Sequence, residues 1–195
     1  MDEPPRELSP EERAKQAYNA GVRAVKKADK YEESALKAVD PRKKEKSEKE
    51  AQERYQDALA KFELAVQSNS SMYEAWNYVG YTKRKLGNYD AALEAYDRAL
   101  KLRPSYPEAI EYRGEAYLRL KRLDDAKQAY LDLFAGNRAL ADKLLGSMKS
   151  WLDTQRSAGG DPATVEEFSK WVAERSQIAG QTAALTREGA GASWR

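Results

Sequence analysis

The feature of this 195-residue sequence that most constrains its fold is a spacing of 34 residues in the middle of the chain. Gly80 and Gly114 are separated by this distance, and the small residues Ala92 and Ala126 follow them with the same separation. The large residues of the two copies keep the same register, at Trp76 and Ile110 and at Tyr96 and Tyr130. An internal period of this length is typical of arrays in which each repeat is a pair of helices that packs on its neighbours.

The segment from Tyr73 to Tyr106 matches a known repeat pattern. Large, small, aromatic and helix-breaking residues stand where the tetratricopeptide pattern W-x2-L-G…A-x3-F…P places them, at Trp76, Val79, Gly80, Ala92, Tyr96, Ala99 and Pro104. The next copy departs from the pattern at Leu133 and Arg138. The chain therefore resembles the tetratricopeptide repeat family. This resemblance implies an all-α solenoid of about three helical hairpins that acts as a noncatalytic module and binds proteins or peptides.

Serine residues ahead of both copies predict where their first helices begin. Ser71 precedes Glu74 by three residues, and Ser105 precedes Glu108 by the same distance. A serine followed by glutamate at this spacing forms a capping box, in which each side chain accepts a hydrogen bond from the backbone N–H of the other residue. We therefore expect Ser71 and Ser105 to be the N-caps of these helices.

The first repeat is longer than the other two. Its small residues Gly21 and Ala58 are 37 residues apart, whereas the corresponding residues of the other repeats are 12 apart. The helical pattern of apolar residues continues through this insertion, and Asp40-Pro41 interrupts it midway. We therefore expect two elongated helices, at about 9–39 and 40–66. Each would overshoot its neighbours by about 12 residues, or roughly 18 Å at helical rise.

The chain is expected to divide into four parts. The segment after the array resembles the extra helix that covers the last repeat of such proteins, because an open solenoid end exposes apolar surface. A second capping helix begins near Asp161. The parts are a flexible N-terminus at 1–8, the array at 9–137, two capping helices within 138–185 and a flexible tail at 186–195. Within the array, the repeats occupy 9–70, 71–104 and 105–137.

The resemblance also implies a concave ligand groove, lined by one stripe of each first helix. The stripe comprises Glu74, Asn77, Tyr78, Tyr81 and Lys85 in the second repeat and Glu108, Glu111, Tyr112, Glu115 and Arg119 in the third. Tyrosine offers a large contact area at little entropic cost, and the carboxylates favour a partner segment that carries Lys or Arg. We expect that changing Tyr78, Tyr81 and Glu111 together removes binding and leaves the fold unchanged.

Two alternatives remain for these side chains. The tyrosines, above all Tyr78 and Tyr112, can pack between repeats instead of binding a partner, because the fold itself uses aromatic residues. Arg84, Lys85 and Arg119 can neutralise the carboxylates, which would leave a surface of mixed charge.

The sequence argues against one well-known use of this family. Some tetratricopeptide co-chaperones hold the C-terminal carboxylate of a heat-shock chaperone with lysine, arginine and asparagine side chains. At the matching positions this chain has Tyr18, Val22, Tyr78, Glu108 and Tyr112. A free carboxylate needs cationic or amide donors, so we do not expect this clamp here.

The outer end of the elongated hairpin carries apolar residues on only one of its two helices. The first helix offers Leu36 and Val39, whereas the returning segment 41–50 is dominated by Lys and Glu. The tip is therefore either a solvated end or a contact site at which Leu36 and Val39 dock against a partner or a second copy of the chain. Self-association as a homodimer, through this hairpin or the C-terminal helices, is the alternative function.

Composition limits the classes of function. The chain has neither His nor Cys, so it lacks the usual general base, thiolate nucleophile and soft metal ligands. We therefore expect no catalytic residues, no metal and no cofactor. Lys and Arg together number 34 against 32 Asp and Glu, and this near balance predicts no nucleic-acid partner.

The sequence shows neither a membrane span nor the apolar core of a signal peptide. No apolar run approaches the ~18 residues that a span needs, so we expect no membrane insertion. Met1 is followed by the polar stretch Asp2-Glu3-Pro4-Pro5. The expectation is a cytoplasmic protein, and the alternative is an exported, periplasmic chain from which a leader has been removed.

Overall fold

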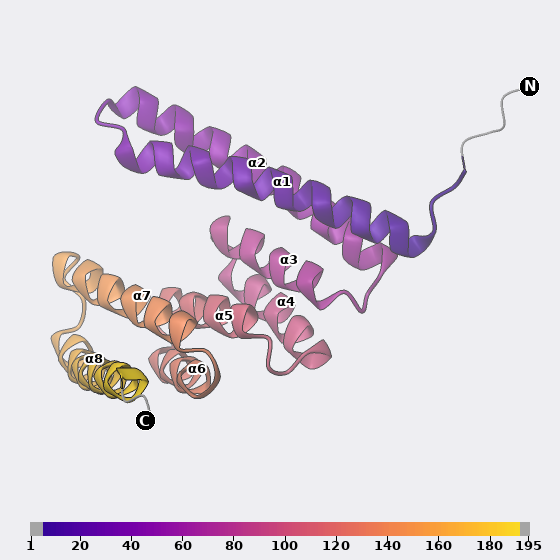
Figure 1. The fold of residues 1–195 in the computed structure, drawn as a ribbon. Helices are drawn as coiled ribbons and strands as arrows, with labels where there is room; N and C mark the ends of the chain where they lie inside the picture. Colours follow the sequence, from indigo (N-terminus) through magenta and orange to yellow (C-terminus); the bar gives the residue numbers. More distant parts are fainter. Residues whose placement is uncertain (1–5, 192–195) are drawn as a thin grey trace, which may run out of the picture.

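The computed structural model describes residues 6–191, within which the chain forms eight α-helices and no β-strand. The predicted all-α fold class is confirmed. From the N-terminus the helices are α1 (Pro10–Lys37), α2 (Pro41–Ser68), α3 (Tyr73–Lys85), α4 (Tyr89–Leu102), α5 (Pro107–Arg119), α6 (Leu123–Gly136), α7 (Arg138–Ser157) and α8 (Pro162–Gly191). Short turns join them (Figure 1).

Consecutive helices pair into hairpins, and the hairpins stack on one another. The most extensive contacts join α1 with α2, α3 with α4, and α5 with α6. Between hairpins, α2 packs on α3 and α4 packs on α5, while α5 also touches α3 and α7. This arrangement is the helical solenoid that the repeats predict. It brings α3, α5 and α7, which are the first helices of their hairpins, next to one another (Figure 1).

The first hairpin is about twice as long as the next two. Its helices α1 and α2 have 28 residues each, against 13 in α3 and 14 in α4. Both expected helix starts are confirmed. Ser9 and Glu12 form a capping box at the start of α1, and Asp40 accepts a hydrogen bond from the backbone N–H of Arg42 at the start of α2.

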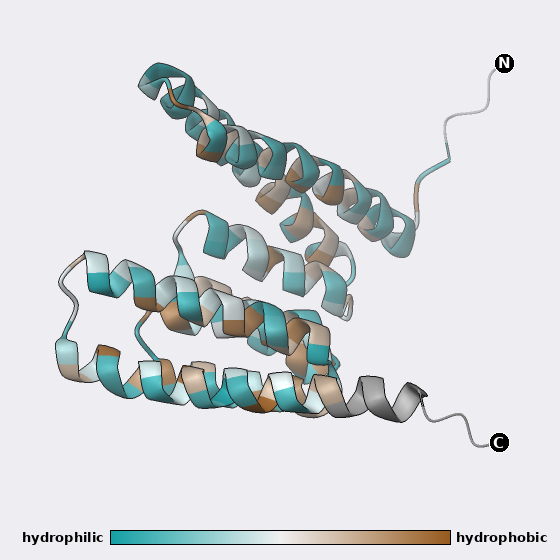
Figure 2. Ribbon diagram, turned by 60° about the vertical axis from the view of Figure 1, so that its left-hand side comes forward, coloured by the Kyte–Doolittle hydropathy of each residue, from teal (hydrophilic) through white to brown (hydrophobic). Residues whose placement is uncertain are grey.

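The outer part of this hairpin, residues 30–50, is called the arm below. It projects past the C-terminal end of α3, and most of its residues are hydrophilic (Figures 1 and 2). Where the arm begins, Tyr55 and Ala28 pack against Tyr81 of α3. At the tip, Leu36 is 82% exposed and Val39 is 98% exposed. The tip therefore carries two apolar side chains that nothing in the described part of the chain covers.

Glycine allows close packing at the repeated small positions. A Cβ atom on Gly80 would lie 2.5 Å from Cε1 of Tyr96, which belongs to the second helix of the same hairpin. In the third repeat, a Cβ on Gly114 would instead lie 2.6 Å from Cδ2 of Leu144 in α7. Glycine thus occupies the same position in both repeats but packs against a different neighbouring helix in each.

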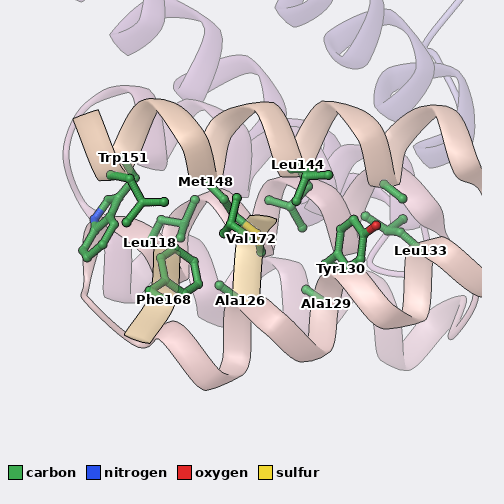
Figure 3. Close-up of a cluster of buried hydrophobic side chains, with 13 residues drawn as sticks. Leu118, Ala126, Ala129, Tyr130, Leu133, Leu144, Met148, Trp151, Phe168 and Val172 are labelled. Atoms are coloured by element: carbon green, nitrogen blue, oxygen red, sulfur yellow. The ribbon is translucent and has the colours of Figure 1, made fainter. Parts of the chain in front are cut away.

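The C-terminal helices cover the end of the array with a large apolar cluster. Helix α7 packs on α5 and α6, and α8 packs on α7. Figure 3 shows the side chains of four helices meeting there, including Leu118 of α5, Tyr130 of α6, Met148 and Trp151 of α7 and Phe168 of α8. This packing places α7 beside α5.

The expected serine caps of the second and third repeats are wrong. Helix α3 has Met72 as its N-cap and α5 has Tyr106, and neither cap makes a side-chain hydrogen bond. Before α3, the indole of Trp76 donates a hydrogen bond to the carbonyl of Ser70, 2.9 Å away, and this contact holds the turn. Before α5, Pro107 occupies the start of the helix, where its fixed φ is already helical.

The last helix is longer than expected. Helix α8 continues to Gly191, whereas the sequence predicted an end near residue 185 followed by a flexible tail. The sequence from 186 to 191 contains no proline that would stop the helix, and its isolated glycines only weaken it. Residues 1–5 and 192–195 of the expected flexible ends lie outside the described residues. Within 6–191, no helix combines the length and the apolar character needed to cross a membrane.

Candidate functional site

A row of tyrosine rings runs across the first three hairpins. Tyr18 of α1 lies 5.7 Å from Tyr78 of α3, and Tyr81 of α3 lies 5.1 Å from Tyr112 of α5, measured between ring centroids. Tyr78 and Tyr81 themselves are 6.1 Å apart. All four side chains are half-buried. We call the surface formed by these four residues the tyrosine face.

The rings of the tyrosine face help to hold the hairpins together. Tyr78 stacks on Phe62 of α2 with their centroids 4.8 Å apart, and the Tyr81 hydroxyl donates a hydrogen bond to Asp29 of α1 at 2.9 Å. The alternative that the tyrosines pack between repeats therefore holds for both residues. A triple change at Tyr78, Tyr81 and Glu111 would disturb this packing, so it does not isolate binding from folding.

The hydroxyls of Tyr18, Tyr78 and Tyr112 differ from that of Tyr81. None of the three has a hydrogen-bond partner among the described residues, and none is a fully buried atom. Burial, and then the neighbouring Tyr78 and Glu74, raises the pKa of Tyr18 to about 12. Burial also raises the pKa values of Tyr78 and Tyr112. These hydroxyls therefore keep their protons near neutral pH and can donate hydrogen bonds.

The carboxyl groups in the middle of the stripe have partners within the protein. Glu115 lies 2.7 Å from a guanidinium nitrogen of Arg84, and Glu111 accepts a hydrogen bond from Nζ of Lys143 at 3.0 Å. The Arg84 guanidinium also lies over the rings of Tyr81 and Tyr112, at 5.3 and 5.4 Å from their centroids. The centre of this surface is therefore close to neutral, as the alternative with Arg84 anticipated.

Lys85 of the stripe also has an internal partner. Its ammonium pairs with Glu32 on the arm side of α1 and lies near the ring of Tyr55. The pair ties the C-terminal end of α3 to the elongated hairpin. Lys85 is thus committed to a contact within the fold.

Two predicted partner-binding residues are buried rather than exposed. Asn77 is 2% exposed and Glu111 is 0% exposed, so neither side chain can touch a partner in this conformation. The next first helix explains the burial of Glu111, because Lys143 of α7 reaches over it. Burial, together with Glu115 nearby, raises the pKa of the Glu111 carboxyl to about 7. One of its oxygens, Oε1, has no hydrogen-bond partner.

Glu74 and Glu108 remain available at one edge of the tyrosine face. Both lie in the first turn of their helices and are half-buried, and neither forms an ion pair or a hydrogen bond with the described residues. Tyr106, which sequence reasoning missed, lies close to this edge, since burial and then Glu108 raise its pKa. The free negative charge of the surface therefore gathers at the N-terminal ends of α3 and α5.

A hollow of about 460 Å³ opens at the opposite edge. It lies between the C-terminal ends of α3 and α5 and the outer half of α7, which has 20 residues against 13 in α5. Arg119, the last residue of α5, lines the hollow and is exposed. The other charged lining residues are Arg84, Glu115, Lys121 and Lys143.

Sequence reasoning missed the contribution of α7 to this surface. Lys143 covers Glu111, and Ser147 donates a hydrogen bond to Glu115 at 2.9 Å. A signal for these contacts was present in the sequence, because polar residues recur along α7 in steps of four, three and four. They are Lys143, Ser147, Ser150 and Thr154, and all four line the hollow.

The described residues contain no group of acidic side chains that could hold a metal ion. Residues 80–121 match a family model whose description is TPR repeat. The match begins at Gly80 in α3, continues through α4 and α5, and ends at Lys121, so it covers the centre of the tyrosine face.

Proposed function

We propose that this chain binds a protein or peptide segment along the tyrosine face, because residues 80–121 match a TPR repeat and such repeats generally mediate protein–protein interaction. The observation that carries the proposal is the set of free hydroxyls on Tyr18, Tyr78 and Tyr112. Their rings are fixed by packing, so a partner can use the hydroxyls at little further cost in side-chain entropy.

The charges at the edge of this surface indicate one feature of the segment. Glu74 and Glu108 form neither an ion pair nor a hydrogen bond with the described residues. A lysine or arginine of the segment would pair with them, as the sequence predicted for the stripe as a whole. The preference for basic residues thus belongs to this edge alone, because Glu111 and Glu115 are already paired.

A five-fold substitution tests the proposal without altering the packing. Tyr18, Tyr78 and Tyr112 are each changed to Phe, and Glu74 and Glu108 are each changed to Gln. The partner is first captured from a lysate of the source organism with the unaltered protein and then purified. We expect its dissociation constant for the variant to rise by at least about tenfold, since each lost hydrogen bond contributes roughly 0.5–1.5 kcal/mol.

A matched control places the same kinds of change away from the tyrosine face. Tyr31 and Tyr89 are changed to Phe, and the exposed Glu53 and Glu94 are changed to Gln. This control should bind the partner as tightly as the unaltered protein. Equal affinity of the five-fold variant and the unaltered protein would contradict the proposal.

A second role, self-association, is favoured by the tip of the arm. Leu36 and Val39 together expose two large apolar side chains, and the facing segment 41–50 of α2 is dominated by Lys and Glu. A homodimer that buries these residues should dissociate in the variants Leu36→Lys and Val39→Lys. Light scattering over a range of protein concentrations measures this, and a monomer at all concentrations would exclude the role.

A further inference from the structure

The hollow beside α7 carries positive charge that no acidic residue of the described chain offsets. Four cationic residues line it, and two of them are matched: Arg84 by Glu115, and Lys143 by the buried Glu111. Arg119 and Lys121 form no ion pair with the described residues, and both are exposed. We infer that this hollow receives carboxylate side chains at the acidic end of the segment bound on the tyrosine face, an inference that rests on the proposed function.

Helix dipoles do not account for all of this charge. Helices α3 and α5 both end at the hollow, and the C-terminal end of a helix carries about half a negative charge. Two such ends offset about one of the two unmatched cations. About one positive charge therefore remains at the hollow, and a concave site with net positive charge favours an anion.

The positions of Arg119 and Lys121 suit a carboxylate. Arginine offers a planar fork of donors that can bind both oxygens of one carboxylate. Lys121 follows α5 with a φ of 57°, which turns the chain so that its side chain also lines the hollow. Hydroxyls along α7 are already used within the protein, as Thr154 donates to the carbonyl of Ser150 at 2.9 Å. The two free cations are thus the main binding groups.

The distance between the two edges sets the length and direction of the segment. Glu108 and Arg119 stand at opposite ends of α5, 11 residues apart, which corresponds to roughly 16 Å of helix. About five residues of extended chain span this distance. A segment with basic residues near Glu108 and acidic residues about five positions away would match both edges while its middle crosses the tyrosine row.

The hollow can be tested on the purified protein with hexaglutamate as the probe. Backbone amide NMR signals are followed at low salt while hexaglutamate, hexaglutamine or inorganic phosphate is added. We expect hexaglutamate to shift the signals of residues 119–122 and 147–155, and hexaglutamine to leave them unchanged. The shifts should weaken when salt rises from about 20 to 300 mM, because the charges involved are exposed.

Matched variants assign the effect to the two free cations. The pair Arg119→Gln and Lys121→Asn removes them; asparagine is chosen because it tolerates a positive φ. The control pair Arg98→Gln and Lys149→Gln removes two exposed cations that do not line the hollow. We expect the first pair to weaken hexaglutamate binding about tenfold or more and the control pair to change it less than twofold, with unchanged circular dichroism in both.

The outcomes separate this inference from the proposed function. Absence of shifts with hexaglutamate, equal shifts in both variant pairs, or binding of phosphate without hexaglutamate would each overturn the assignment to carboxylates. None of these results affects binding of the captured partner to the tyrosine face, which the five-fold variant tests. If the five-fold variant binds the partner as tightly as the unaltered protein while hexaglutamate still binds the hollow, the tyrosine face is excluded as the binding surface. The hollow would then be an isolated anion site.

Discussion

Helices α3 and α5 have the same 34-residue register and different surroundings, and the difference separates what the repeat determines from what its neighbours determine. Asn77 and Glu111 occupy the same position and are both buried. Burial is thus a property of the position, whichever residue is there. The charge at this position differs between the repeats, because α5 has a carboxyl group where α3 has a neutral amide. Only the position in α5 is contacted by Lys143 of α7.

The largest expected difference between the two positions is a dependence of stability on pH. The folded protein keeps the Glu111 proton up to about pH 7, whereas the unfolded chain loses it near pH 4.5. Between these values the folded state binds more protons, so this group lowers the free energy of unfolding as pH rises, and the effect is complete above about pH 7. We expect Glu111→Gln to be more stable than the unaltered protein by about 3 kcal/mol at pH 8 and equal to it near pH 4.

Urea unfolding at pH 4, 6 and 8 measures this difference. The converse substitution Asn77→Asp places a carboxyl in the equivalent buried position of α3 and should produce a similar loss of stability as pH rises. If Glu111→Gln and the unaltered protein show the same pH profile, the carboxyl titrates at the same pH in the folded and the unfolded protein. The comparison between the two positions would then fail.

The second difference concerns the glycines. A Cβ at Gly80 meets the rigid ring of Tyr96, whereas a Cβ at Gly114 meets the terminal methyl groups of Leu144 and, at 3.3 Å, the Cβ of Ala129. Tyr96 and Leu144 are both fully buried. We expect Gly80→Ala to lower the free energy of unfolding by about 2 kcal/mol through overpacking. Gly114→Ala should lower it by less than about 1 kcal/mol, because the end of a leucine side chain can shift more easily than an aromatic ring and alanine favours the helix. Urea unfolding of both variants checks this, and equal losses would contradict it.

The 34-residue register made much of this fold predictable from the sequence. The spacing of Gly80 and Gly114 implied paired helices in a solenoid, and the Asp40-Pro41 break implied the long first hairpin. The tyrosine face was predictable as well, because the positions of Tyr78, Tyr81 and Tyr112 follow from the same register. The hollow beside α7 was not.

The rest depended on contacts that a repeat period does not contain. Lys143 and Glu111 are 32 residues apart, and their meeting depends on how α7 is rotated on α5. That rotation is set by the apolar cluster that joins α7 to its neighbours, which contains Leu144 of α7 and Phe168 of α8. The helical spacing of the polar residues on α7 marks one stripe of that helix, but the spacing alone does not show that this stripe lies over α5.

The smallest expected effect concerns the two serines that resembled helix caps. Ser71 and Ser105 are exposed and make no capping bond, because α3 and α5 begin after Met72 and Tyr106. We expect Ser71→Ala and Ser105→Ala each to change the free energy of unfolding by less than about 0.5 kcal/mol. Asn137 is the matched control, since it does cap the next first helix, accepting a hydrogen bond from the N–H of Leu140 at 3.1 Å. Its change to Ala should cost about 1 kcal/mol in urea unfolding, and a loss of that size at either serine would show that the capping box forms in solution.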